Sequence, residues 1–173
     1  MPLTIGSRPP APDDPFALLA DCHERIRRFS ALAMKLAKAP PETPPAELAD
    51  AAAAVIRYFT IALPLHEQDE EASLAPRLGD RDLPDAARAA LSALGPEHRA
   101  LEETLAGLVP RWQAISEDPA TIGEPLLPLS QRLTALFDAH LQREELDLFP
   151  AARTALTATD LAALLREIRD RRR

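Results

Sequence analysis

The chain of 173 residues contains little cysteine, glycine or aromatic residue. Its single cysteine, Cys22, cannot form an intrachain disulfide, which excludes a small fold held together by disulfides. Five glycines and 4% aromatic residues are too few for a typical β-sandwich or β-barrel. Alanine, leucine, arginine and glutamate are abundant, and these residues favour helices. We therefore expect an all-α fold.

Positive charge and long apolar runs are also scarce. Lysine and arginine number 20 against 27 acidic residues, and the net charge of −7 argues against a nucleic-acid partner. No uninterrupted apolar run approaches the ~20 residues of a membrane helix, and the N-terminus does not resemble a secretion signal. The expected localisation is cytoplasmic, with no nucleic-acid and no membrane partner.

The 18 prolines cluster between apolar stretches, where they delimit helices. Residues 1–12 are predicted to form a proline-rich arm, and residues 13–173 a single domain. Short loops between long helices favour an antiparallel up-down four-helix bundle with an extra C-terminal helix. The first predicted helix has Asp13 or Asp14 as N-cap and Pro15 at its first position, and it runs to about residue 38. The other predicted helices span residues 45–74 with a kink at Pro64, 84–94, 96–116 with a kink at Pro110, 124–148 ending near Pro150, and a last helix capped by Thr159 and Asp160 that ends in solvated arginines.

An internal repeat runs through the chain. The segments 66–76 and 140–150 both read H-x-Q-x-E-E-x-x-L-x-P and lie 74 residues apart. His23 and His98 are similarly 75 residues apart. The repeat therefore includes all four histidines of the sequence and divides the chain into two helical hairpins of similar design.

The periodicity of the apolar residues places these histidines inside the bundle. Each histidine lies three or four residues from an apolar neighbour on its helix, which is the spacing of a buried face. Glu70 and Glu144 each follow a histidine by one turn on the same face. The histidines come early in the first and third long helices and late in the second and fourth. In an antiparallel bundle, all six side chains then lie at the same level.

A single inward histidine is usually structural, but two inward glutamates are harder to explain. An unpaired buried carboxylate costs several kcal/mol, and neither lysine nor arginine lies near these glutamates on the inward faces. A metal is the economical partner, and the donors are too many for one tetrahedral zinc but suit two carboxylate-bridged first-row ions, iron or manganese. A metal-free helical interaction protein is the remaining alternative. The candidate ligands are His23, His66, Glu70, His98, His140 and Glu144.

The series His23, His66-x3-Glu70, His98, His140-x3-Glu144, each pair followed by Leu-x-Pro, resembles the hemerythrin-like (HHE cation-binding) domains over about residues 13–152. The resemblance implies a four-helix bundle that holds two iron ions in a non-haem di-iron centre bridged by Glu70 and Glu144. It implies a protein that binds or senses O2 or NO. The alternative is a redox or iron-donating stress-response protein that reduces NO or peroxide or repairs iron centres.

The sequence departs from the oxygen-carrying hemerythrins in the third helix. It has His98-x3-Glu102 where those proteins have a second histidine, and its fourth motif has Glu144 after a three-residue gap where theirs has an aspartate after four. The set is closer to a bacterial branch with four histidines and two glutamates. Fewer histidines favour ferric iron over reversible oxygen carriage.

Four other residues have open or simple interpretations. Glu67 is either an extra ligand or a solvated residue. Glu102 is a ligand, a residue that supports a ligand, or an exposed residue, and the last two interpretations are favoured. Cys22 is expected to pack beside His23, and Trp112 is expected in the core.

Overall fold

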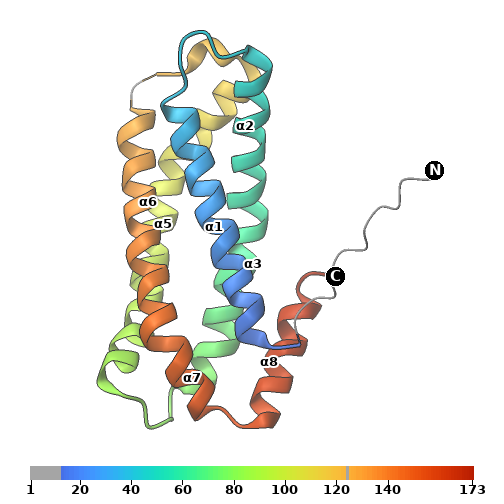
Figure 1. Cartoon of the computed structure of the whole chain (residues 1–173), viewed down its shortest axis with the longest axis vertical. Coiled ribbons are helices and arrows are strands. Elements are labelled where there is room, and N and C mark those ends of the chain that lie inside the picture. The colour runs from blue at the N-terminus through green and yellow to red at the C-terminus, as the bar shows by residue number, and fades with distance from the viewer. Residues whose placement is uncertain (1–12, 124) are drawn as a thin grey trace, which may run out of the picture.

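The computed structural model describes residues 13–123 and 125–173. The predicted arm, residues 1–12, lies outside the described residues. The regular structure of the described part is entirely helical, and Figure 1 shows four long helical rods side by side, running up, down, up and down. The all-α prediction is confirmed.

The rods consist of one to five helical segments each. The bounds are α1 (Pro15–Ala37) for the first rod; α2 (Pro45–Arg57), η1 (Tyr58–Ala62), α3 (Leu63–Gln68), η2 (Asp69–Leu74) and α4 (Ala75–Leu78) for the second; α5 (Asp85–Glu117) for the third; and α6 (Leu126–Arg143), η4 (Glu144–Leu148) and α7 (Phe149–Ala155) for the fourth. A short 3-10 turn, η3 (Pro119–Thr121), precedes the fourth rod, and α8 (Ala158–Asp170) follows it. The segments η1, η2 and η4 are π-helical.

The start of α1 follows local chemistry. The Asp14 side chain accepts a hydrogen bond from the backbone N–H of Phe16, and Pro15 occupies the first helical position. Both features satisfy or remove N–H groups that a helix start leaves without partners. Of the two predicted caps, Asp14 therefore makes the capping bond.

The predicted break at Gly95-Pro96 is wrong, because α5 continues from Asp85 to Glu117 through Pro96 and Pro110. Both prolines lie on the exposed side of α5. There, the carbonyl that loses its helical N–H partner can bond to water instead. The buried face continues from Leu94 through His98 without interruption.

The prediction that Pro150 ends the fourth helix is also wrong, and the second rod likewise continues beyond Leu74. Pro64, Pro76 and Pro150 each lie two residues after the end of a π-helical segment. A proline cannot donate to the carbonyl four residues earlier, and its ring clashes with that carbonyl. The wider π turn accommodates each proline, so the rods continue to Leu78 and Ala155.

The C-terminal helix α8 was predicted, but its cap was misplaced. Thr157 is the N-cap, and Asp160 at the third helical position completes a capping box with it. Leu164 and Ile168 are buried and pack with Leu74 and Leu78 of the second rod. The last helix thus lies against the side of the bundle near one end, as the red segment in Figure 1 shows.

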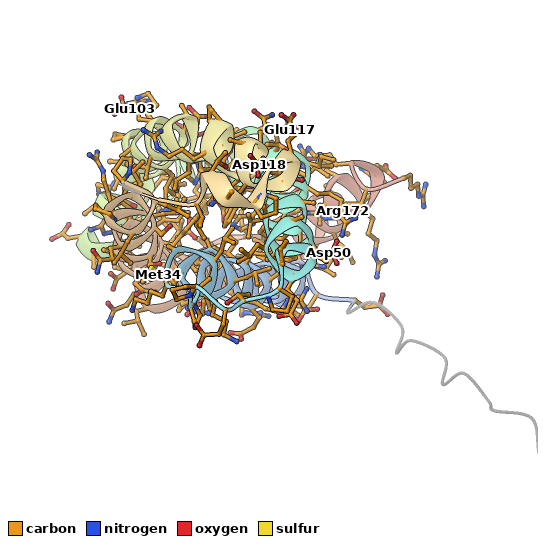
Figure 2. All side chains as sticks on the ribbon, turned by 90° about the horizontal axis from the view of Figure 1, so that it is seen from above. Met34, Asp50, Glu103, Glu117, Asp118 and Arg172 are labelled. Atoms are coloured by element: carbon orange, nitrogen blue, oxygen red, sulfur yellow. The ribbon has the colours of Figure 1, made fainter. Side chains whose placement is uncertain are left out.

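The core divides into two apolar clusters that lie above and below the candidate ligands. One contains Phe59, Trp112 and Phe137, and the other contains Leu74 and Leu148. Along each rod, the histidine comes between a member of one cluster and a member of the other. In the view along the bundle, side chains fill the space between the rods (Figure 2). The polar site is therefore a layer between two apolar layers.

The second rod, Pro45–Leu78, is long and apolar enough to cross a membrane by length and composition, because an 18-residue window within it has a mean hydropathy of 1.5. The search of the sequence for an uninterrupted apolar run therefore missed this segment. The core helix of a soluble protein passes the same test. Here the rod packs against α1 and α5 and carries His66 and Glu70.

Candidate metal centre

All six predicted ligands converge inside the bundle. His23 comes from α1, His66 and Glu70 from the second rod, and His98 from α5. The fourth rod supplies the other two side chains, His140 and Glu144. None of the six is more than 3% exposed. Glu70 and Glu144 lie in the π-helical segments η2 and η4, and such segments occur often at functional sites.

Glu70 and Glu144 each join the two sides of the site. Glu70 Oε1 lies 3.3 Å from His66 Nε2, and Glu70 Oε2 lies 3.3 Å from His98 Nε2. Glu144 Oε2 lies 3.2 Å from His23 Nε2, and Glu144 Oε1 lies 3.5 Å from His140 Nε2. Each carboxylate thus presents one oxygen to a histidine pair on either side.

Two groups of donor atoms result, and they share both carboxylates. One consists of His23 and His66 with the two glutamates, and the other of His98 and His140 with the same glutamates. Within each group the donor atoms lie within 4.8 Å of one another. His98 Nε2 and His140 Nε2 are 3.2 Å apart, close to the ~3 Å expected of neighbouring nitrogens bound at ~2 Å from one ion.

Several of these atoms have no hydrogen-bond partner in the described structure. They are His23 Nε2, His66 Nε2 and both carboxylate oxygens of Glu70 and of Glu144. Buried polar atoms are almost always paired, because an unsatisfied one costs about 1–3 kcal/mol and a charged one more. Metal ions bound by both groups would satisfy all six atoms at once. The residues therefore fit a metal site.

Three further glutamates orient the histidines from behind. Glu145 Oε1 lies 2.8 Å from His23 Nδ1, Glu71 Oε1 lies 2.8 Å from His98 Nδ1, and Glu97 Oε2 lies 2.9 Å from His140 Nδ1. A carboxylate at Nδ1 holds the proton there and leaves Nε2 free to bind a metal. Sequence reasoning missed all three. The second glutamate of each E-E pair, Glu71 and Glu145, could have been found from the repeat.

His66 is the exception among the histidines. Its Nδ1 is buried and has no hydrogen-bond partner in the described structure. The neighbouring Glu67 is half-buried, and its Oε1 also lacks a partner. The position of Glu67 is compatible with an extra ligand and with a solvated residue. Glu102 is exposed on α5. Cys22 is buried next to His23, and Trp112 is fully buried in the core.

The electrostatics of the metal-free site are dominated by the two glutamates. Burial alone lowers the pKa of His23, but the close carboxylates of Glu144 and Glu70 outweigh it and raise the pKa to about 10. The pKa of His98 rises to about 9, because Glu70 and Glu71 outweigh burial in the same way. For His66, burial outweighs the charge of Glu70 and lowers the pKa to about 3.

The carboxylates respond to the same surroundings. Burial would raise the pKa of Glu70, but the nearby histidines hold it well below its usual range. Burial and the charge of Glu70 raise the pKa of Glu144. Burial raises the pKa of Glu67 to about 7. Protonated histidines therefore balance the buried carboxylates when no metal is present.

The C-terminal arginines differ from the prediction of a solvated tail. Arg171 Nη1 lies 2.8 Å from Asp69 Oδ1, and Arg172 Nη2 lies 2.5 Å from Asp69 Oδ2. Asp69 is fully buried and immediately precedes Glu70. The cause of the difference is tertiary: α8 folds back so that its end meets η2.

Comparison with known proteins identifies the family. The family model "Hemerythrin HHE cation binding domain" matches residues 14–170. The chain belongs to the hemerythrin family. The match extends through α8, beyond the region that carries the histidine motifs. Among curated proteins, none matches this hemerythrin-family chain.

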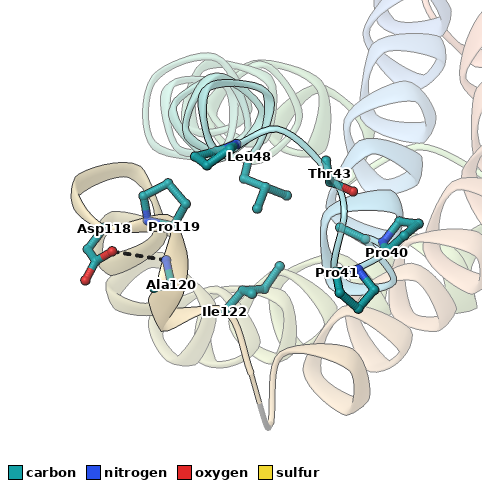
Figure 3. Close-up of a pocket in the computed structure, with 10 residues that line it drawn as sticks. Pro40, Pro41, Thr43, Leu48, Asp118, Pro119, Ala120 and Ile122 are labelled. Atoms are coloured by element: carbon teal, nitrogen blue, oxygen red, sulfur yellow. Dashed lines mark hydrogen bonds between the residues drawn. The ribbon is translucent and has the colours of Figure 1, made fainter.

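The bundle also has a pocket at the end opposite α8, between the α1–α2 loop and η3 (Figure 3). It has a volume of about 460 Å³ and is lined by Pro40, Pro41, Leu48 and Ile122, among others. None of the six candidate ligands lines it, and among the described residues that line it Asp118 alone is ionisable. The pocket is therefore separate from the histidine–glutamate cluster.

Proposed function

We propose that this chain holds a non-haem di-iron centre and binds or senses O2 or NO there. His23 and His66 would bind one iron, and His98 and His140 the other. Glu70 and Glu144 would bridge the pair. The observation that carries the proposal is the sharing of both carboxylates between two histidine pairs.

The donor set supports iron over zinc or copper. Each ion would receive two imidazole nitrogens and two carboxylate oxygens, which leaves a five- or six-coordinate ion an open position. Structural zinc sites are closed and tetrahedral, whereas imidazole with carboxylate and no thiolate suits iron or manganese. Cys22 is not among the grouped donors.

The surroundings support a small, uncharged ligand. An iron pair supplies a redox-active position at which a diatomic molecule can bind. The protein contributes an enclosure with apolar ends: the ring of Phe149 stacks on His23 with centroids 5.2 Å apart, and the two apolar clusters close the site from both ends. Such walls exclude water and charged solutes, while O2 and NO can enter through side-chain motion.

The test is metal analysis of the purified protein together with its absorption spectrum, before and after reduction and exposure to O2 or NO. We expect two irons per chain and a spectral change that reverses when the gas is removed. Sustained consumption of NO or peroxide would instead support the redox alternative. Zinc, or no metal, would contradict the proposal.

Two variants and a control identify the ligands. His66→Ala and Glu70→Gln should lose most of the bound metal and the spectral bands, because both remove a donor from the cluster. Glu102→Gln, an exposed change on the same end of the bundle, should keep both. Retention of two irons in Glu70→Gln would show that Glu70 is not a bridge.

A further inference from the structure

The carboxylate of Asp69 is fully buried, yet it is not one of the grouped metal donors. It instead binds two guanidinium groups from the end of the chain, those of Arg171 and Arg172. Arg171 also donates to the hydroxyl of Ser73, at 2.5 Å, which is likewise fully buried. The C-terminus thus holds η2, the π-helical segment that contains Glu70, at two points.

The rest of α8 is attached to the same rod. Arg77 of α4 makes a bidentate bond to Glu167, at 3.1 and 2.6 Å, and Arg81, in the turn that follows the rod, pairs with Asp160 at 2.8 Å. Leu164 packs into the apolar cluster below the site. In the view along the bundle, Arg172 lies where α8 borders the second rod (Figure 2). Polar and apolar contacts therefore dock α8 onto the second rod.

The repeat shows that this arrangement belongs to one half of the site. Position 69 corresponds to position 143 in the second half. There, Arg143 pairs with Glu97, and Glu97 orients His140. Both groups come from the bundle rods themselves.

In the first half, the cation comes from outside the four rods. Asp69 is the repeat equivalent of Arg143, and Cys22 is the repeat equivalent of Glu97. Arg172 lies between these two side chains, at 2.5 Å from Asp69 Oδ2 and 3.7 Å from Cys22 Sγ. Cys22 and Asp69 are the direct sequence neighbours of His23 and Glu70. One arginine thus joins α1 and η2, two of the three helical segments that carry candidate ligands of this half.

We propose that Arg171 and Arg172 are positioning residues for the His23/His66 half of the metal site, and that α8 is a C-terminal latch. By holding Asp69, they fix the π-helical turn that aims Glu70 at the histidines. The contacts of the latch do not require a bound metal, and only its effect on metal binding rests on the proposed function.

The first test uses the metal-free protein and amide hydrogen exchange. The double variant R171Q/R172Q removes both charges from Asp69. R173Q is the matched control, because the Arg173 side chain is 80% exposed and, among the described residues, forms its ion pair with Asp170. We expect exchange to become several-fold faster over residues 66–74 in the double variant. The repeat supplies an internal control, since exchange over residues 140–148 should stay unchanged.

Equal exchange over residues 66–74 in the double variant and the wild type would overturn the latch, as would equal acceleration in both repeat segments. If the double variant fails to fold, the single variant R171Q carries the test. It leaves Arg172 on Asp69, and we expect it to show the same segment-specific acceleration at smaller amplitude.

The second test measures metal binding by competition with a chelator, using Fe²⁺ under anaerobic conditions. Where the wild type and R173Q bind two ions, R171Q/R172Q should bind the ion of the His23/His66 group about tenfold more weakly. The loss at the other ion should be smaller, because Glu70 serves both groups but Arg172 contacts only the neighbours of His23 and Glu70. Unaltered affinity for both ions would contradict the positioning role. A wild type that binds no pair of ions would contradict the proposed function instead, while the exchange experiment would still decide the latch.

Discussion

At the scale of single residues, the E-E pair of each repeat performs two tasks. Glu70 and Glu144 face the histidine cluster, and Glu71 and Glu145 reach a histidine of the opposite half, His98 and His23 respectively. Adjacent helical residues point about 100° apart, so one position can face the metal while the next contacts a neighbouring rod. The two hairpins are thereby joined by reciprocal hydrogen bonds.

The convergence of the six candidate ligands could be predicted because all of them lie on periodic inward faces, which a single helix determines. Glu97 could not be predicted in the same way. It lies outside the inward face of α5, and its partner His140 is 43 residues away on another rod. A pairing of that kind depends on how the rods pack.

The supporting role of Glu145 leads to the first prediction. Glu145→Gln keeps the shape of the side chain but removes the charge that holds His23 Nδ1–H. Loss of such a carboxylate weakens metal binding by about 10–100-fold. We expect this decrease in affinity, measured by chelator competition, together with little change in the fold seen by circular dichroism.

Glu71→Gln should weaken binding to a similar extent, because Glu71 holds His98 at the same 2.8 Å distance. Glu103→Gln, an exposed change on α5, is the control and should bind metal as the wild type does. An affinity of Glu145→Gln equal to that of the control would show that the hydrogen bond to His23 is dispensable.

At the scale of helical elements, prolines have two different outcomes in this chain. Pro96 and Pro110 remain inside a regular α-helix, whereas Pro64, Pro76 and Pro150 follow π-helical segments. Sequence rules treat an internal proline as a break or a kink and do not show which outcome applies. The difference depends on burial and packing of the rod, which only the assembled bundle determines.

The cap of α8 gives a second prediction at this scale. Thr157→Ala removes the hydroxyl that accepts from the backbone N–H of Asp160 and leaves one end of the capping box without its partner. Such a loss costs about 0.5–2 kcal/mol of folding free energy. We expect a lower unfolding temperature by calorimetry.

Thr159→Ala is the matched control, since Thr159 lies in the first turn of the same helix and was the wrongly predicted cap. It should leave the unfolding temperature nearly unchanged. A larger loss in Thr159→Ala than in Thr157→Ala would contradict the observed capping box.

At the scale of the whole molecule, a buried charged layer lies between two apolar layers and must be neutralised for the chain to fold. Metal ions that bind the folded state alone stabilise it by mass action. Iron loading should therefore raise the unfolding temperature, and removal of iron by a chelator should lower it again. Identical melting curves with and without iron would show that the layer does not bind the metal.

The three histidines with shifted pKa values should together contribute most to the stability of the metal-free protein near pH 6.5, the ordinary pKa of histidine. The pKa values of His23 and His98, about 10 and 9, lie above that value, so their stabilisation is complete below pH 6.5 and is lost as the pH rises through 9 and 10. The pKa of His66, about 3, lies below it, so its contribution is present above pH 6.5 and is lost as the pH falls toward 3. Denaturant unfolding of the metal-free protein from pH 4 to 10 would show this maximum, and stability that rises steadily through pH 9 would contradict it.

The same protonation equilibria should couple metal uptake to proton release. At pH 7.5 the metal-free protein keeps protons on His23 and His98, whose pKa values are about 10 and 9. Binding to Nε2 requires the neutral imidazole, so each of these histidines must lose a proton when a metal binds. We expect release of about two protons per chain, measured by titration calorimetry in buffers of different ionisation enthalpy. His66 is already neutral and should release no proton. His66→Gln should therefore reduce metal affinity, whereas the number of protons released for each metal ion bound by His98 should stay the same. Metal uptake without proton release would mean that the carboxylates do not hold protonated histidines in the metal-free site.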